Sequence, residues 1–535
     1  MSASAPNRHP SHGSETAYVT TPIYYVNDRP HIGHAYTTTL CDVWARFMRI
    51  SGRDVFFLTG TDEHGVKVEK SAKERGVSPQ QLADENAAEF RRVLGLFGLS
   101  NDDFIRTTEP RHERQVQRFL ERLERSGAVY LGEFEGWYDE GQEEYHTETK
   151  AKELDYRSPV TGKPLVRAKE SNYYFRLSAF AERLEKHFEA NPDFVRPIGR
   201  RNEVLGRLRE GLQDVPITRT NFSWGIPMPG ADGHVVYVWI DALFNYATAL
   251  GLGEEDSFAG ERAKYWPADF HVIGKEILWF HAVIWPALLM ALDLPLPKCV
   301  YAHAFWIADG QKMSKSLGNF VDLEAIARYH ERYGLDAWRW FMSTRGPLGA
   351  ADADFREDHF ADAYLTDLVN TVGNGASRVT AMAERYFEGN VPCPEDPHRV
   401  IDGQDWGATV ASALGEAQGA ANAFAIDRMA TAGLSLFRAI DGFIHRTEPF
   451  KIAKDPARRD ELARILHQSL EVLHAASALL WPLMPGSMDR LREALGQESV
   501  EHGGTLGEQV RMDASRRFER VRKVALFPRV EAATA

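Results

Sequence analysis

Two short motifs combine residue types that suit phosphate chemistry, and the first is a pair of histidines. His31 and His34 are three residues apart in His-Ile-Gly-His, at the expected start of a helix. At this spacing both imidazoles lie on one face of the first turn, where unpaired backbone N–H groups and the helix dipole attract an anion. Gly33 leaves the backbone open to a flat ring. The motif predicts donors for a phosphate that gains charge in a transition state, although such a pair also fits simple packing or capping.

The second motif, Lys-Met-Ser-Lys-Ser, begins at Lys312 and contains two lysines and two small hydroxyl residues. We expect a cationic loop in which Lys312 and Lys315 neutralise a pyrophosphate leaving group. By itself the pentamer also fits a solvated basic turn. The chain contains neither a GxxxxGK(S/T) nor a GxGxxG pattern, so no other nucleotide-binding fingerprint competes with these two motifs.

The elements that must position the histidines follow the pattern of a parallel α/β sheet. A strand over 17–22, a helix over about 31–50 and a second strand over 54–60 succeed one another with short connections. Asn27 or Asp28 is expected to cap the helix, because short polar side chains accept the first free N–H groups.

The remaining sequence divides into an insertion, more sheet and a helical end. Residues 120–225 are charged and rich in turn formers, so we interpret them as an insertion between two halves of the sheet. Strand character returns at 234–240 and 269–274. After about 361 the pattern is almost wholly helical and predicts a bundle.

The composition is that of a globular protein, with 44% hydrophobic and 26% charged residues. The net charge of −13 means that a polyanion must meet a local basic patch. Three scattered cysteines exclude a disulfide framework, and no apolar run reaches the ~18 residues of a membrane span. Residues 1–16 lack the apolar core of a secretory signal, so we expect a disordered leader, a cytoplasmic location and no membrane partner.

Taken together, the motifs resemble those of the class I aminoacyl-tRNA synthetases, and more narrowly of the methionyl-tRNA synthetase family. The resemblance extends from about Tyr18 to Arg529 and rests on the segments that begin at Thr21, Thr59, Tyr237, His271 and Lys312. It implies a Rossmann-like α/β catalytic domain with a connective insertion, followed by an all-α anticodon-binding domain. The implied boundaries are 17–119 and 226–300 for the catalytic domain, 120–225 for the insertion, 301–360 for the stem-contact region and 361–535 for the anticodon-binding domain.

The resemblance also implies an activity: ATP-dependent attachment of L-methionine to tRNA(Met) for protein synthesis, including initiation. The reaction passes through a methionyl-adenylate and releases AMP and pyrophosphate. Because the attacking carboxylate is already ionised at neutral pH, the chemistry needs positioning and charge stabilisation rather than a general base. The implied cofactor is ATP with Mg²⁺, and the implied partners are L-methionine, ATP and tRNA(Met). We expect a monomer.

Residue roles carry over by match to the family motifs. The implied catalytic residues are His31, His34, Lys312 and Lys315. The implied ATP-binding residues are Thr21, Pro22, His31, Gly33, His34, Gly274, Lys275, Lys312 and Lys315. The implied methionine-binding residues are Ile23, Tyr25, Asp62, Trp239, Ala242, Tyr246, His281 and Trp285. Of these, Asp62 is expected to bind the ammonium group, and Tyr25 or His281 to donate a weak hydrogen bond to the sulfur; each aromatic taken alone also fits plain core packing.

The implied anticodon residues are Asn374, Arg378 and Phe450. Phe450 stands where the family often has tryptophan, and its ring is still able to stack on an unpaired base. Asp139, Gln142, Ser158 and Thr161 stand where many relatives have zinc-binding cysteines. Because a tetrahedral thiolate site needs thiolates, we expect no zinc and an insertion that holds its shape by packing.

Two other functions remain open on the sequence alone. One is a tRNA-binding protein that has lost catalysis, which the intact motifs oppose. The other is the same adenylating chemistry on another amino acid. Relatives for leucine, isoleucine and valine carry a much longer insertion, and a cysteinyl enzyme needs zinc-binding thiols, so methionine is favoured.

Overall fold

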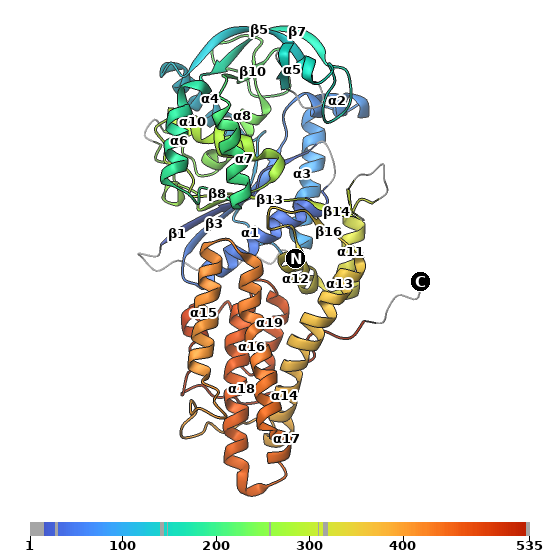
Figure 1. The fold of residues 1–535 in the computed structure, drawn as a ribbon, viewed down its shortest axis with the longest axis vertical. Coiled ribbons are helices and arrows are strands. Elements are labelled where there is room, and N and C mark those ends of the chain that lie inside the picture. Colours follow the sequence, from blue (N-terminus) through green and yellow to red (C-terminus); the bar gives the residue numbers. More distant parts are fainter. Residues whose placement is uncertain are drawn as a thin grey trace.

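The computed structural model describes residues 15–26, 30–139, 144–146, 148–255, 258–308, 310–313 and 319–530. The molecule is elongated, with a mixed α/β part at one end and a helical bundle at the other (Figure 1). None of the helices within the described residues is long and apolar enough to cross a membrane.

Within the described residues, seven parallel strands form the central sheet, which confirms the predicted α/β class. The strand order is β2-β3-β1-β12-β13-β8, and β4 also pairs with β3. The inner strands are apolar and buried on both faces, as a parallel sheet covered by helices requires. Their bounds are β1 Thr16–Thr20, β2 Tyr24–Tyr25, β3 Asp54–Asp62, β4 Asp103–Arg106, β8 Val195–Arg196, β12 Phe270–Gly274 and β13 Val300–His303.

The helix predicted over 31–50 is present as α1 (Ile32–Ile50). The predicted cap is wrong: the N-cap residue is His31, whose side chain accepts the backbone N–H of Gly33. Asn27 and Asp28 lie outside the described residues. The imidazole Nδ1 is as close to the backbone as an Asx side-chain oxygen, so a histidine performs the task that Asn or Asp normally performs. The next helices are α2 (Val66–Arg75), α3 (Pro79–Leu96) and α4 (Pro110–Arg125).

The strand predicted over 234–240 is largely wrong. Only β11 (Val235–Val236) is extended, and the chain then forms α8 (Val238–Leu243) and α9 (Asn245–Thr248). A short apolar run does not distinguish a buried strand from a buried helix, which explains the error. The strand predicted over 269–274 is confirmed as β12. It leads into a 3₁₀ turn, η3 (Lys275–Ile277), a π-helical turn, η4 (Phe280–Ile284), and α10 (Trp285–Ala291).

Residues of the expected insertion form a second, antiparallel sheet at the far end of the α/β part (Figure 1). Its order is β6-β5-β7-β9, and the nearby β10 pairs with β11. The elements of this region are β5 Val129–Asp139, β6 Glu144–His146, α5 Glu148–Glu153, β7 Val166–Phe175, η1 Leu177–Phe180, α6 Ala181–Ala190, α7 Ile198–Arg209, β9 Val215–Pro216 and β10 Thr218–Arg219.

Side-chain packing connects this sheet to α5 near the positions where relatives have cysteines. Trp137 donates its indole N–H to Glu148 at 2.8 Å, and the hydroxyl of Tyr156 donates to the same carboxylate at 2.9 Å. The rings of Trp137 and Tyr156 lie 4.6 Å apart. The Ser158 hydroxyl accepts the backbone N–H of Thr161 at 3.1 Å. Across the described part of the chain, no group of three or more His, Cys, Asp and Glu side chains is arranged to hold a metal ion.

A small sheet and a helical bundle complete the molecule, and the bundle agrees with the prediction for the last third. The small sheet has the order β15-β14-β16, and its strands are β14 Trp306–Ala308, β15 Gln311–Lys312 and β16 Ala353–Asp354. The helices are α11 Leu323–Tyr333, α12 Leu335–Arg345, α13 Glu357–Ala363, η6 Tyr364–Gly373, α14 Asn374–Phe387, α15 Trp406–Asn422, α16 Ile426–Thr447, α17 Pro449–Ile452, α18 Arg459–Leu480, α19 Pro485–Ala494 and α20 Leu506–Val510.

A buried arginine ties the α/β part to the bundle. The guanidinium of Arg339 on α12 lies 2.7 Å from the carboxylate of Asp42 on α1. It also donates to the carbonyls of Pro482 and Leu483, just after α18. Because a buried charge is costly unless it is paired, this contact fixes α1, and therefore its N-terminal histidines, against the bundle.

Candidate active site

A cavity of about 990 Å³ opens at the carboxyl ends of the central strands. Pro22, Asp62, Gly274 and His303 line it just after or at the ends of β1, β3, β12 and β13. The sheet order reverses at β1, which has β3 on one side and β12 on the other. Such a switch point is where open parallel sheets bind ligands. The predicted site residues that line this cavity are Pro22, Ile23, Tyr25, His31, Gly33, His34, Asp62, Trp239, Ala242, Tyr246, Gly274 and His281.

The two histidines of α1 use one ring nitrogen each as a backbone acceptor. Nδ1 of His31 accepts the N–H of Gly33 at 3.0 Å, and Nδ1 of His34 accepts the N–H of His31 at 3.1 Å. In a neutral imidazole the proton then lies on Nε2. Burial, helped by the neighbouring His31 ring, lowers the pKa of His34 well below its usual value. The pair therefore caps the helix through Nδ1 of each ring.

The segment that carries the lysine motif returns to the histidines. The ring of Phe320 lies 5.3 Å from the ring of His31, and the N–H of Ile32 donates to the carbonyl of Val321 at 3.3 Å. Burial raises the pKa of Glu276, a cavity residue, while the positive charges of Lys275 and Lys312 oppose that rise. Lys312 on β15 is therefore within electrostatic reach of the cavity.

The prediction for Lys315 falls on residues 314–318, which lie outside the described part of the chain.

Three other predicted ATP residues have well-defined surroundings. Gly274 is packed against the Glu276 side chain, because a Cβ there would lie 2.4 Å from a carboxylate oxygen. Lys275 does not line the cavity; its ammonium group lies 2.6 Å from Asp352 and over the ring of Phe305. Thr21 is buried and does not line the cavity, and its hydroxyl and that of Thr59 are hydrogen-bonded at 2.7 Å.

The predicted methionine residues form an aromatic wall with a neutral histidine. Trp239 stacks on Phe280 with ring centroids 4.5 Å apart. The Tyr246 hydroxyl donates to Nε2 of His281 at 2.7 Å, while Nδ1 of His281 donates to the carbonyl of Ile277 at 2.9 Å. Burial lowers the pKa of His281 to about 4, so the ring is neutral at pH 7. Both ring nitrogens are engaged, so donation from His281 to a sulfur atom is not part of this arrangement.

Trp285 lies behind this wall rather than on it. Its side chain is fully buried and packs 6.0 Å from Tyr246, centroid to centroid, and its indole N–H donates to His271 at 3.3 Å. The π-helical turn η4 precedes Trp285, so the residue does not share the face that the four-residue spacing from His281 predicts. Trp285 supports Tyr246 from the core.

An acidic residue stands opposite the aromatic wall. Asp62 is buried at the end of β3, directly paired with Tyr25 of β2. Beyond it Gly65 has a φ of +102°, and a Cβ there would lie 3.0 Å from the Tyr25 hydroxyl and 3.5 Å from Val238 of α8. The glycine therefore allows Tyr25 and α8 to approach the loop that follows Asp62.

The cavity residues that were not identified from the sequence include Lys67, Arg207, Glu276 and His303. Nε2 of His303 and the hydroxyl of Thr37 on α1 are hydrogen-bonded at 2.7 Å, and burial lowers the pKa of His303 to about 4. The sequence could have indicated His303 as a site residue, because it ends a buried strand at the same edge of the sheet as Asp62. Arg207 comes from α7 of the insertion and lies 3.9 Å above the Trp279 ring, a contact that no local pattern reveals.

The predicted anticodon residues lie in the bundle, in a region separate from the cavity. Asn374 is exposed at the start of α14, and Arg378 on the same helix forms an ion pair with Asp441 of α16. Phe450 on α17 is 43% exposed, a large fraction for a phenylalanine. The neighbouring basic residue Arg446 forms an ion pair with Asp402.

Comparison with known proteins supports one reading of this site. Residues 17–154 and 150–380 match the family described as tRNA synthetases class I (M). The methionine–tRNA ligase of Oceanobacillus iheyensis is 42% identical over 503 residues, which are 92% of this chain and 74% of that protein. The methionine–tRNA ligase of Rhizobium meliloti is 41% identical over 526 residues, 97% of this chain and 99% of that protein. Mycobacterium tuberculosis methionyl-tRNA synthetase bound by methionyl-adenylate matches with a TM-score of 0.88 at 35% identity, over 96% of this chain and 100% of that one.

Proposed function

The chain belongs to the methionyl-tRNA synthetases of class I, and from this membership we infer that it attaches L-methionine to tRNA(Met) at the expense of ATP. The reaction passes through a methionyl-adenylate and releases pyrophosphate and then AMP. The observation that carries the inference is that one cavity has the two histidines of α1, the buried Asp62 and the aromatic side chains in its walls.

In the first step we propose that the methionine carboxylate attacks the α-phosphorus of ATP and that the bond to the pyrophosphate oxygen breaks. His31 and His34 donate from Nε2 to phosphate oxygens that gain negative charge, and Lys312 and Lys315 neutralise the departing pyrophosphate. No residue has to remove a proton, because the nucleophile is already ionised. Mg²⁺ would enter with ATP and supply further charge stabilisation on the phosphates.

Methionine is held by one charged contact and an apolar wall. Asp62 binds the ammonium group, and its burial strengthens the attraction. Ile23, Trp239, Ala242 and Tyr246 surround the thioether side chain, which offers only dispersion contacts and a weakly accepting sulfur. In this proposal Tyr25 and His281 complete the wall of the methionine site, and Trp285 supports Tyr246 from behind.

In the second step the terminal adenosine of tRNA(Met) takes the methionyl group. We propose that the bundle holds the anticodon through Asn374, Arg378 and the stacking surface of Phe450. In this arrangement the insertion over 120–225 and the region over 301–360 form the connective and stem-contact parts. We further propose that the enzyme is a cytoplasmic monomer, which light scattering tests against the 60.3 kDa chain mass.

The deciding experiment is methionine-dependent exchange of labelled pyrophosphate into ATP by the purified protein, repeated with each of the other amino acids. We expect exchange with methionine and little with the rest. Folded protein that binds tRNA(Met) but catalyses no exchange would instead be a tRNA-binding relative. Exchange that depends on another amino acid would reassign the substrate.

A further inference from the structure

A buried polar network lies directly behind the cavity and joins three separate elements. Nδ1 of His64, in the loop after β3, lies 2.6 Å from one carboxylate oxygen of Asp241 on α8. Nε2 of His112 on α4 lies 2.6 Å from the other oxygen. His112 and Asp241 are fully buried and His64 is 2% exposed. None of the three lines the cavity, so none is in position to touch a ligand there.

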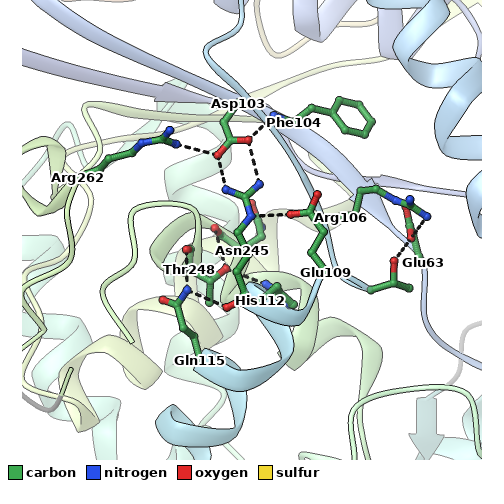
Figure 2. A network of polar contacts seen from close by, with 12 residues as sticks. Glu63, Asp103, Phe104, Arg106, Glu109, His112, Gln115, Asn245, Thr248 and Arg262 are labelled. Atoms are coloured by element: carbon green, nitrogen blue, oxygen red, sulfur yellow. Dashed lines mark hydrogen bonds and ion pairs between the residues drawn. The ribbon is translucent and has the colours of Figure 1, made fainter. Parts of the chain in front are cut away.

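The second nitrogen of His112 extends the network to α9. Nδ1 of His112 bonds the hydroxyl of Thr248 at 2.7 Å, and the amide of Gln115, one turn further along α4, donates to the carbonyl of Thr248 at 3.0 Å. Figure 2 shows His112 and Gln115 on one helix reaching toward Asn245 and Thr248 on another. Two consecutive short helices, α8 and α9, are thereby held against α4.

The network is charged rather than simply polar. Burial alone would raise the pKa of Asp241, but His64 and His112 outweigh it and lower that pKa. Burial alone would lower the pKa of His64, but Asp241, with smaller help from Glu113 and Glu63, raises it. The centre is therefore a buried carboxylate with one imidazole nitrogen 2.6 Å from each of its oxygens. Removing one histidine leaves a buried carboxylate oxygen of Asp241 without its partner, which is costlier than losing a surface pair.

The positions of these residues relate the network to the methionine site. His64 follows Asp62 by two residues, and Asp241 stands between Trp239 and Ala242 on α8. Glu63, between Asp62 and His64, is held by Arg106 through two hydrogen bonds of 2.7 and 2.8 Å (Figure 2). The two residues that directly follow Asp62 are thus both held in place, and the only direct ionic link of this loop to α8 within the described residues is His64 with Asp241.

We propose that His64, Asp241 and His112 form a positioning network that sets the distance between the acidic and the aromatic walls of the methionine site. This inference rests on the proposed function, because it assigns the network a role in binding that amino acid. Apolar side chains would fill the same space without burying a charge, so we assign this network to geometry rather than to stability. The affected quantity is methionine affinity rather than the chemistry on the phosphates.

The test compares variants that keep or remove a single N–H donor. An asparagine side chain places its amide nitrogen where histidine has Nδ1, and a glutamine places its amide nitrogen near Nε2. His64→Asn and His112→Gln therefore keep the donor to Asp241, whereas His64→Ala and His112→Ala remove it. Arg111→Gln is the matched control. Arg111 lies on α4 next to His112 but does not line the cavity, and the substitution removes its ion pairs with Asp103 and Glu109.

The readouts are KM for methionine, KM for ATP and kcat in pyrophosphate exchange, together with circular dichroism and thermal midpoint. We expect the two alanine variants to raise KM for methionine by about tenfold or more, with KM for ATP changed less than about twofold. The donor-keeping variants should recover most of that loss. The control should lower only the thermal midpoint.

Equal rises in both KM values, or unchanged methionine KM in folded alanine variants, would overturn the proposed role and leave the network as a stabilising one. If an alanine variant does not fold, the donor-keeping variant at the same position decides: a methionine KM near that of the parent supports the proposal, and a tenfold rise shared with KM for ATP overturns it. Absence of methionine-dependent exchange in the parent protein is a separate result, since it refutes the proposed function itself.

Discussion

The histidine at the third position of α1 has two tasks that two substitutions separate. Nδ1 of His34 accepts the His31 N–H at 3.1 Å and so caps the helix, while we propose that Nε2 is the donor to a ligand in the cavity that His34 lines. His34→Asn keeps an acceptor at the Nδ1 position and has nothing at Nε2. His34→Gln keeps a donor near Nε2 and has no acceptor at the Nδ1 position; its amide oxygen caps the His31 N–H only when the side chain folds back and leaves the cavity position. Both variants lose the ring contacts with Tyr24 and Phe90, so that loss cancels when the two are compared.

The expected magnitudes follow from the two contacts. A side-chain cap contributes about 1 kcal/mol to the free energy of unfolding, so His34→Gln should be less stable than His34→Asn by at most about that amount, because its amide oxygen is able to fold back to the cap. A preorganised donor to a developing oxyanion contributes about 3–4 kcal/mol to the transition state, so His34→Asn should lower kcat for exchange by roughly 10²- to 10³-fold. His34→Gln should retain activity within about tenfold of the parent.

Urea unfolding measures the first difference, and initial rates of methionine-dependent pyrophosphate exchange at saturating substrates measure the second. The reasoning fails if His34→Asn keeps near-parent kcat while His34→Gln loses it, because Nδ1 would then be the catalytic nitrogen. Equal losses of kcat would also count against it, since they would assign the whole effect to ring packing.

The remaining predictions concern the lysine loop, the bundle and acid stability. Lys315→Ala should lower kcat for adenylate formation by roughly 10²-fold or more while KM for methionine changes little, because the charge acts as pyrophosphate leaves; comparable losses in both constants would remove Lys315 from that role. Phe450→Ala should lower kcat/KM for tRNA charging by about five- to a hundredfold, the value of one base stack, and leave pyrophosphate exchange unchanged; unaltered charging would exclude Phe450 from the anticodon site. The pKa values of His281 and His303 are lowered to about 4 by burial, whereas an unfolded histidine titrates near 6.5, so the unfolded chain binds more protons between these values. The free energy of unfolding should therefore fall as pH drops from about 6.5 to 4, and His303→Gln should flatten that dependence in urea titrations; an unchanged slope would show that His303 is charged in the folded protein.

Much of the fold followed from sequence patterns with a local physical cause. The strand–helix–strand start appeared because β1 and β3 are apolar runs and α1 repeats its apolar residues at helical spacing. The errors have local causes as well. After His234 the run over 235–240 is apolar without a break, so periodicity did not reveal that it turns helical at Val238. The helix cap at His31 was missed because histidine rarely takes that position.

The site was predicted mainly through motifs, and the parts that were missed depend on long-range packing. Nothing near Trp285 in the sequence reveals the π-helical turn that moves it behind Tyr246. The ion pair of Lys275 joins residues 77 positions apart. The contact of His64 with Asp241 joins residues 177 positions apart. Such pairs arise from the closure of the sheet and are invisible to any local pattern.

The central claim is that the histidines of α1 and the lysines that begin at Lys312 act on one bound nucleotide beside one bound methionine. A crystal structure with methionine and a non-hydrolysable ATP analogue tests it most directly. The account predicts phosphate oxygens within hydrogen-bond distance of Nε2 of His31 and His34 and of the loop ammonium groups, with the methionine ammonium on Asp62. Phosphates bound away from the histidines, or a lysine loop closed over a different cavity, would contradict it.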